Sequence, residues 1–146
     1  MISGRDFLAL AEIWIKGSTE AEWRSAVSRA YYGVFHVARQ FMEDLGFLVP
    51  RGDQAHAYLW LRLSNSGDVQ LQIAGSDLNI LRRDRNRSDY EVKVTLLHAN
   101  ALLQVQAAAQ IIKIIEAINQ NPLRAQVTDA MKNYERDILK VVTWRP

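Results

Sequence analysis

An apolar stripe with helical spacing runs through residues 20–45 of this chain of 146 residues. The stripe consists of Trp23, Val27, Ala30, Val34, Val37, Phe41 and Leu45. Steps of three or four residues place side chains on one face of an α-helix, and that face can then pack into a core. No segment alternates apolar and polar residues over the length of a strand, and no β-hairpin turn is evident. The pattern predicts an all-α fold.

Helix-start signals divide the chain further. Three segments fit the capping box, in which a Ser or Thr hydroxyl and a nearby acid satisfy free N–H groups at a helix start. They are Ser3 to Asp6, Thr19 to Glu22 and Ser88 to Glu91. Asn121-Pro122 fits a start with Asn as cap and Pro at the first helical position. The expected helices span about 4–16, 20–45, 54–63, 69–86, 89–119 and 122–141. We expect one domain, an up-and-down bundle of five to six helices, with the last serving for added packing or dimerisation.

The composition is that of a globular chain, with 49% hydrophobic and 23% charged residues. The formal net charge of +2 permits a polyanionic partner but does not require one. The absence of cysteine excludes disulfides, thiolate catalysis and cysteine-based zinc sites. The three histidines share no helix face with metal-ligand spacing, so we expect no metal and no cofactor.

The most apolar segment, residues 92–118, is interrupted by several charged, amide and histidine side chains, which argues against a membrane helix. The N-terminal residues lack the basic and apolar pattern of a signal peptide. We therefore expect a cytoplasmic protein with no membrane contact. The polar residues of the helix at 89–119 keep to no single stripe, so this helix is either central to the bundle or shared with a second subunit.

Positive charge is concentrated in residues 82–87, where four arginines stand with one aspartate. The segment ends where Ser88 is expected to cap a new helix. The start of a helix offers free N–H groups and a positive dipole end, and guanidinium groups grip phosphate in bidentate fashion. The segment is therefore a candidate RNA-phosphate site. A solvated turn of mixed charge is the alternative, and composition alone favours it.

Two segments carry motifs: Ser28-Arg29-Ala30-Tyr31-Tyr32-Gly33-Val34-Phe35-His36-Val37-Ala38-Arg39, and Arg85-Asn86-Arg87-Ser88-Asp89-Tyr90. They resemble the Ser-Arg-Ala-Tyr-Tyr-x-x-Phe-His-x-Ala and Arg-x-x-Ala-Asp-Tyr signatures of the HEPN family, in its small prokaryotic branch. His56 also stands where that branch often has a histidine. The likeness covers roughly residues 5–118. It implies an up-and-down helical bundle that commonly dimerises.

Active members of this family are metal-independent ribonucleases, in which an arginine holds the scissile phosphate and a histidine exchanges protons. By resemblance Arg85 matches that arginine, Asn86 matches the polar residue after it, and Tyr90 stands at the histidine position. Tyrosine titrates at about pH 10, so it is mostly the wrong form for a base at neutral pH. It remains a hydrogen-bond donor and a stacking surface, so Arg85 and Tyr90 suit binding better than cleavage.

The resemblance thus implies an RNA- or nucleotide-binding module with degenerate or absent nuclease activity, acting as a homodimer. It also implies a toxin–antitoxin or defence system, in which the companion is a nucleotidyltransferase-type protein or another antitoxin. The residues expected to bind RNA or nucleotide are Arg82, Arg85, Asn86, Arg87, Asp89, Tyr90, Tyr32 and His36. In this hypothesis Arg85 holds phosphate, Asp89 orders the arginines, and Tyr90 hydrogen-bonds or stacks.

Two alternatives stay open. One is an active endoribonuclease, in which Arg85 works with Tyr90 or His56 as catalytic residues. The other is a purely structural oligomerisation module built on the helices at 89–119 and 122–141. Charge-driven RNA binding weakens steeply with salt, whereas a hydrophobic interface does not, so salt dependence separates binding from assembly.

Overall fold

The computed structural model describes residues 1–146 and consists of six α-helices, with no β-strand. The helices are α1 (Gly4–Trp14), α2 (Glu20–Leu45), α3 (Gln54–Ser64), α4 (Val69–Tyr90), α5 (His98–Ile118) and α6 (Leu123–Tyr134). A short π-helical turn, Glu135–Leu139, continues α6. The predicted all-α fold is therefore confirmed, and the expected last helix is shorter than the range 122–141.

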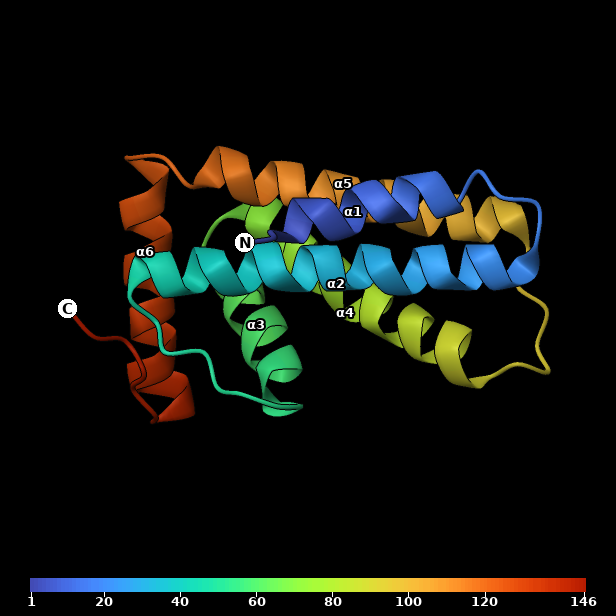
Figure 1. The fold of residues 1–146 in the computed structure, drawn as a ribbon. Helices are drawn as coiled ribbons and strands as arrows, with labels where there is room; N and C mark the ends of the chain where they lie inside the picture. The colour runs from blue at the N-terminus through green and yellow to red at the C-terminus, as the bar shows by residue number, and fades with distance from the viewer.

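Helices α1, α2, α4 and α5 follow one another in alternating directions along the molecule, and α3 and α6 cross them near one end (Figure 1). Helix α2 packs against α1, α3, α4 and α5, so the helix with the clearest apolar stripe is the central one. The core contains 31 buried apolar residues drawn from all six helices. This arrangement follows from the sequence because α2 buries apolar side chains along nearly its whole length.

Two of the three predicted capping boxes are confirmed. The Asp6 carboxylate accepts a hydrogen bond from the Ser3 N–H at 2.7 Å, and the Thr19 hydroxyl accepts one from the Glu22 N–H at 3.3 Å. These contacts satisfy N–H groups that have no partner inside the helix. At the last helix the prediction is off by one residue, because Pro122 precedes α6 and no side chain caps it.

The third predicted capping box, at Ser88, is wrong. Helix α4 runs on to Tyr90, residues 91–97 form a loop, and α5 begins only at His98. The loop contains β-branched residues, which disfavour helix, and Ser88 itself is buried within α4. The arginine-rich segment 82–87 therefore lies in the last turns of a helix. Its positive charge complements the negative end of the helix dipole, and the predicted anion site at a helix start does not exist.

The α1–α2 contact depends on two glycines. A Cβ atom at Gly4 would overlap the carbonyl oxygen of Gly33, so the two helix backbones approach closely at this point. The close approach brings Phe7 of α1 onto His36 of α2, with their ring centroids 5.1 Å apart and nearly parallel. The N-terminal helix thereby contributes a side chain to the surface of α2.

Helix α5 is long and apolar enough to span a membrane, judged by length and composition alone. In this fold it packs along α1, α2 and α4 and buries part of its surface in the core. The buried residues are Ala101, Val105, Ala108, Ile111, Ile112, Ile115 and Ile118. Its apolar character is thus used for packing, as expected for a central helix.

The C-terminal segment is fixed by a buried ion pair. Glu135, fully buried, accepts hydrogen bonds from the Arg62 Nε at 2.8 Å and from the Thr143 N–H at 2.9 Å. The Arg62 guanidinium also lies 3.4 Å from the centroid of the Tyr58 ring. The indole N–H of Trp144 donates to the Leu45 carbonyl at 2.8 Å. These contacts tie α3, the π-helical turn and the chain end to the bundle.

Candidate functional site

Arg85 lies in the last turns of α4 and faces α2 rather than solvent. Its side chain is only 11% exposed, and its guanidinium lies 5.5 Å from the ring centroid of Tyr31 and 5.2 Å from that of Tyr32. The Nε atoms of Arg82 and Arg85 are buried and have no hydrogen-bond partner in the chain. Both guanidinium groups therefore keep unused donor capacity beside an aromatic surface.

Asp89 connects this arginine to α2. Its carboxylate lies 3.6 Å from Arg85 Nη1 and accepts a hydrogen bond from the Ser28 hydroxyl at 3.3 Å. The pair spans one helical turn, the spacing at which opposite charges on a helix meet. We name the surrounding group the Arg85 cluster. It consists of Ser28, Tyr31, His56, Arg82, Arg85 and Asp89.

His56 approaches the Arg85 cluster from α3. Its Nδ1 atom shares a hydrogen bond with the Tyr31 hydroxyl, the two rings lie 5.6 Å apart, and its surface is 9% exposed. Burial lowers the pKa of His56, and the charges of Arg82 and Arg85 lower it further. Burial raises the pKa of Tyr31. At neutral pH the cluster therefore holds a neutral imidazole and a protonated phenol.

Tyr90 lies outside the Arg85 cluster. It is the last residue of α4 and its side chain is 74% exposed, with no partner in the fold. Arg87 and Asn86 also point elsewhere, because they lie on other faces of the same helical turns. The structure thus brings Arg82, Arg85 and Asp89 together with His56, and separates them from Tyr90.

A series of guanidinium groups and aromatic rings begins at Arg85 of α4 and continues on α2 and α1. The Tyr32 ring lies close to two guanidinium groups, that of Arg85 at 5.2 Å and that of Arg29 at 5.5 Å from the ring centroid. Arg29 in turn lies 5.6 Å from the ring of Phe7, which stacks on His36. We name this series, Arg85, Tyr32, Arg29, Phe7 and His36, the stacking row. All five side chains are partly accessible to solvent.

Sequence reasoning predicted some members of these groups and missed others. Tyr32 and His36 were expected at a binding surface, and both lie in the stacking row. Phe7 was missed, because it enters the row only through the close α1–α2 packing at Gly4. Ser28 and Arg29 lie in the motif of α2, and their helical spacing from Tyr32 was the signal that could have found them.

No protein family, curated protein or solved structure matches this chain. No group of three or more His, Cys, Asp or Glu side chains is arranged to hold a metal ion. What the site can do chemically therefore rests on its own geometry. Guanidinium groups supply bidentate contacts to phosphate, and the rings supply flat apolar faces.

The neutral state of His56 has a measurable consequence. Because the pKa of His56 in the fold lies below its ordinary value of 6.5, the unfolded chain takes up a proton at a higher pH than the folded chain. The stability that neutral His56 contributes is complete above about pH 6.5 and is lost as the pH falls toward the folded pKa. We expect the free energy of unfolding, measured in urea at pH 7.5, 6.5 and 5.5, to decrease as the pH decreases.

The variant His56→Asn should show a smaller fall over the same pH range, whatever its absolute stability. His36→Asn should also reduce it, because burial and then the charge of Arg39 lower the pKa of His36. An unchanged slope in His56→Asn would contradict the assignment of a buried neutral imidazole.

Proposed function

We propose that the chain is a HEPN-type module that binds single-stranded RNA, with bases on the stacking row and phosphates at Arg82 and Arg85. The observation that carries the proposal is the alternation of guanidinium groups and rings from Arg85 to Phe7, with His36 stacked on Phe7. Single-stranded nucleic acids are bound by this combination, because every base has a flat face and every nucleotide has a phosphate. The motif resemblance of α2 and α4 supports the same reading.

The free energies expected for these contacts are those of a binding module. Stacking of a base on an aromatic side chain contributes about 1–3 kcal/mol, and each neutralised phosphate adds salt-dependent affinity. The rings of Tyr32 and Phe7 are partly exposed, whereas Tyr31 is buried and serves to position Arg85. The net charge of +2 is small, so local placement of arginines rather than overall charge would provide the attraction.

The experiment is fluorescence anisotropy of a labelled ten-nucleotide RNA at several salt concentrations. We expect Tyr32→Leu and Arg29→Ala each to weaken binding about tenfold, and Arg29→Ala to flatten the salt dependence. The matched control is Arg39→Ala, which removes an arginine from the same helix outside the stacking row. Equal affinities of the control and both variants, or affinity insensitive to salt, would contradict the proposal and favour an assembly module.

A second candidate function is metal-independent cleavage of RNA, with His56 rather than Tyr90 as the proton-transfer group. The specific observation is that Tyr31 contacts both His56 and Arg85. If Nδ1 of His56 donates to the Tyr31 hydroxyl, its Nε2 is left as an acceptor, as a general base requires. Incubation of labelled RNA in chelator, with His56→Gln and Arg85→Ala beside the parent chain, tests this reading. Cleavage that survives both substitutions would exclude it.

A further inference from the structure

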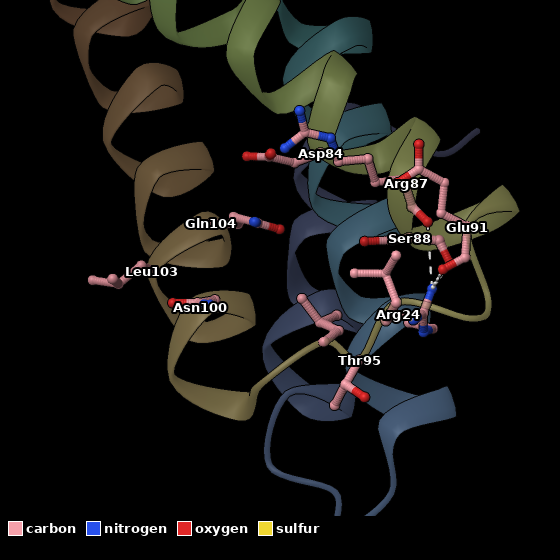
Figure 2. Close-up of a pocket in the computed structure, with 11 residues that line it drawn as sticks. Arg24, Asp84, Arg87, Ser88, Glu91, Thr95, Asn100, Leu103 and Gln104 are labelled. Carbon is pink, nitrogen blue, oxygen red and sulfur yellow. Dashed lines mark hydrogen bonds between the residues drawn. The ribbon is translucent and has the colours of Figure 1, made fainter.

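A pocket separate from the Arg85 cluster lies between the end of α4, the loop 91–97 and the start of α5. Its volume is about 320 Å³, within the range of small-ligand sites. Figure 2 shows Asp84 and Arg87 entering from α4 and Asn100 and Gln104 entering from α5, with their polar groups directed at the same space. Two consecutive helices thus face one another across the pocket, joined by the loop 91–97.

On one wall of the pocket, most of the hydrogen-bond donors of Arg24 are already used within the chain. The Arg24 guanidinium donates to the carbonyl oxygens of Arg87 at 3.3 Å, Ser88 at 3.0 Å and Glu91 at 3.3 Å, and also to that of Val94. Its Nε donates to a Glu20 carboxylate at 3.2 Å. Arg24 therefore shapes the pocket and leaves at most one N–H donor, on Nη2, for a ligand. Most of the charge that a ligand meets comes from other residues.

The remaining polar groups lack partners within the chain. Asp84 is half-buried and forms no ion pair or hydrogen bond, and Gln104 Oε1 is buried without a donor. Burial raises the pKa of Asp84 while Arg87 and Arg83 lower it, which places Asp84 away from water but near cationic groups. Arg87 itself forms no ion pair. Asp84 and Gln104 therefore present unfilled acceptors beside the free guanidinium of Arg87, and Glu91, whose carboxylate has no partner, lines the same pocket.

These groups match one nucleobase edge better than the others. Guanine presents two adjacent N–H donors, at N1 and N2, next to the O6 acceptor. A carboxylate accepts both donors, and a guanidinium donates to O6. Adenine, cytosine and uracil each place a lone pair where one of those donors would be, and that lone pair would face the carboxylate of Asp84. Val94 and Leu96 of the loop also line the pocket and offer apolar surface to the ring.

We propose that this pocket binds a guanine base, with Asp84 accepting from N1–H and N2–H, Arg87 donating to O6 and Gln104 accepting a further N–H. The guanine belongs either to a free nucleotide or to an RNA strand. Binding of a free guanine nucleotide is inferred from the pocket residues alone. Binding of a guanine within RNA rests also on the proposed function.

The experiment is isothermal titration of the full chain with GMP, IMP, AMP, CMP and UMP. We expect GMP to bind at least tenfold more tightly than AMP, CMP or UMP, and IMP, which lacks the 2-amino group, to fall between. Asp84→Asn keeps the shape of the side chain and should remove most of the preference for GMP. The matched control is Asp77→Asn, an aspartate of α4 outside the pocket.

A parallel titration compares oligouridylate RNA with the same RNA carrying one guanosine or one adenosine. Tighter binding of the guanosine RNA that Asp84→Asn abolishes supports the RNA source, and binding of GMP alone supports the free nucleotide. The variant Tyr32→Leu should weaken RNA binding and leave GMP binding unchanged, so the two proposals fail independently. Equal affinity for GMP and AMP, or a preference for GMP that persists in Asp84→Asn, would overturn the guanine pocket.

Discussion

Arg62→Ala is expected to lower the free energy of unfolding by about 3–5 kcal/mol, the range for removal of one partner from a buried ion pair. The Arg62 side chain is 5% exposed and that of its partner Glu135 is 0% exposed. Burial on its own raises the pKa of Glu135, but hydrogen bonds from Thr143 and Arg62 together with the charge of Arg62 outweigh it, so the pKa is lowered. Without Arg62 the carboxylate stays buried and loses much of the stabilisation of its charge.

Urea unfolding followed by circular dichroism measures this loss. The control is Arg136→Ala, because Arg136 forms a fully exposed pair with Asp137 at 2.9 Å and its removal should cause no resolvable change. The double variant Arg62→Met/Glu135→Leu should recover part of the lost stability, since it removes both buried charges together but leaves the N–H groups of Thr143 and Trp144 without their acceptor. A loss in Arg62→Ala no greater than in the control would mean that Glu135 finds other partners or solvent.

The helices that local signals mark were predictable, as was a break between α4 and α5, but the position and length of that break were not. The capping boxes at Ser3 and Thr19 involve residues within one turn of each other, so the sequence displays them directly. The same pattern at Ser88 is overridden by contacts with Arg24, more than 60 residues away in the chain. A signal that depends on three neighbouring residues cannot report such a contact.

The candidate site was also predictable only in part, namely where its residues lie within one short segment. The arginines of α4 and the tyrosines of α2 stand out in the sequence because each group lies within one short segment. Their pairing depends on how α4 crosses α2, and the place of His56 depends on α3. The motif alone gave Tyr90 a role equal to that of Arg85. The helix geometry instead turns Arg85 toward the core and Tyr90 toward solvent.

The two proposed sites share the last turns of α4 but use different faces of it. Positions 82, 85 and 89 face α2 and α3, whereas positions 84 and 87 face α5. The exposed face between them carries Arg83 and Tyr90. A strand lying across this face could meet the Arg85 cluster on one side and the guanine pocket on the other, since a helix with its side chains is only about 10 Å wide. The position of the end of α4 therefore matters to both sites.

Arg24→Ala is expected to lower the free energy of unfolding by about 2–3 kcal/mol, because a hydrogen bond from a charged donor contributes about 1.5–3 kcal/mol and several are lost together. The Arg24 side chain is 12% exposed and donates to four carbonyl groups at the end of α4 and in the following loop. The carbonyls of Ser88 and Val94 accept no backbone N–H, whereas those of Arg87 and Glu91 also accept one each. The helix dipole favours a cation at this end.

Arg24→Lys should lose less than Arg24→Ala, because an ammonium keeps the charge but cannot span all four carbonyls. Arg39→Ala, which breaks a partly exposed pair on the same helix, should cost less than about 1 kcal/mol. Hydrogen exchange should then rise specifically in residues 87–97 of Arg24→Ala, and GMP affinity should fall without any change to Asp84. If exchange instead rises evenly over the whole chain, Arg24 stabilises the bundle at large, and the end of α4 is held by other contacts.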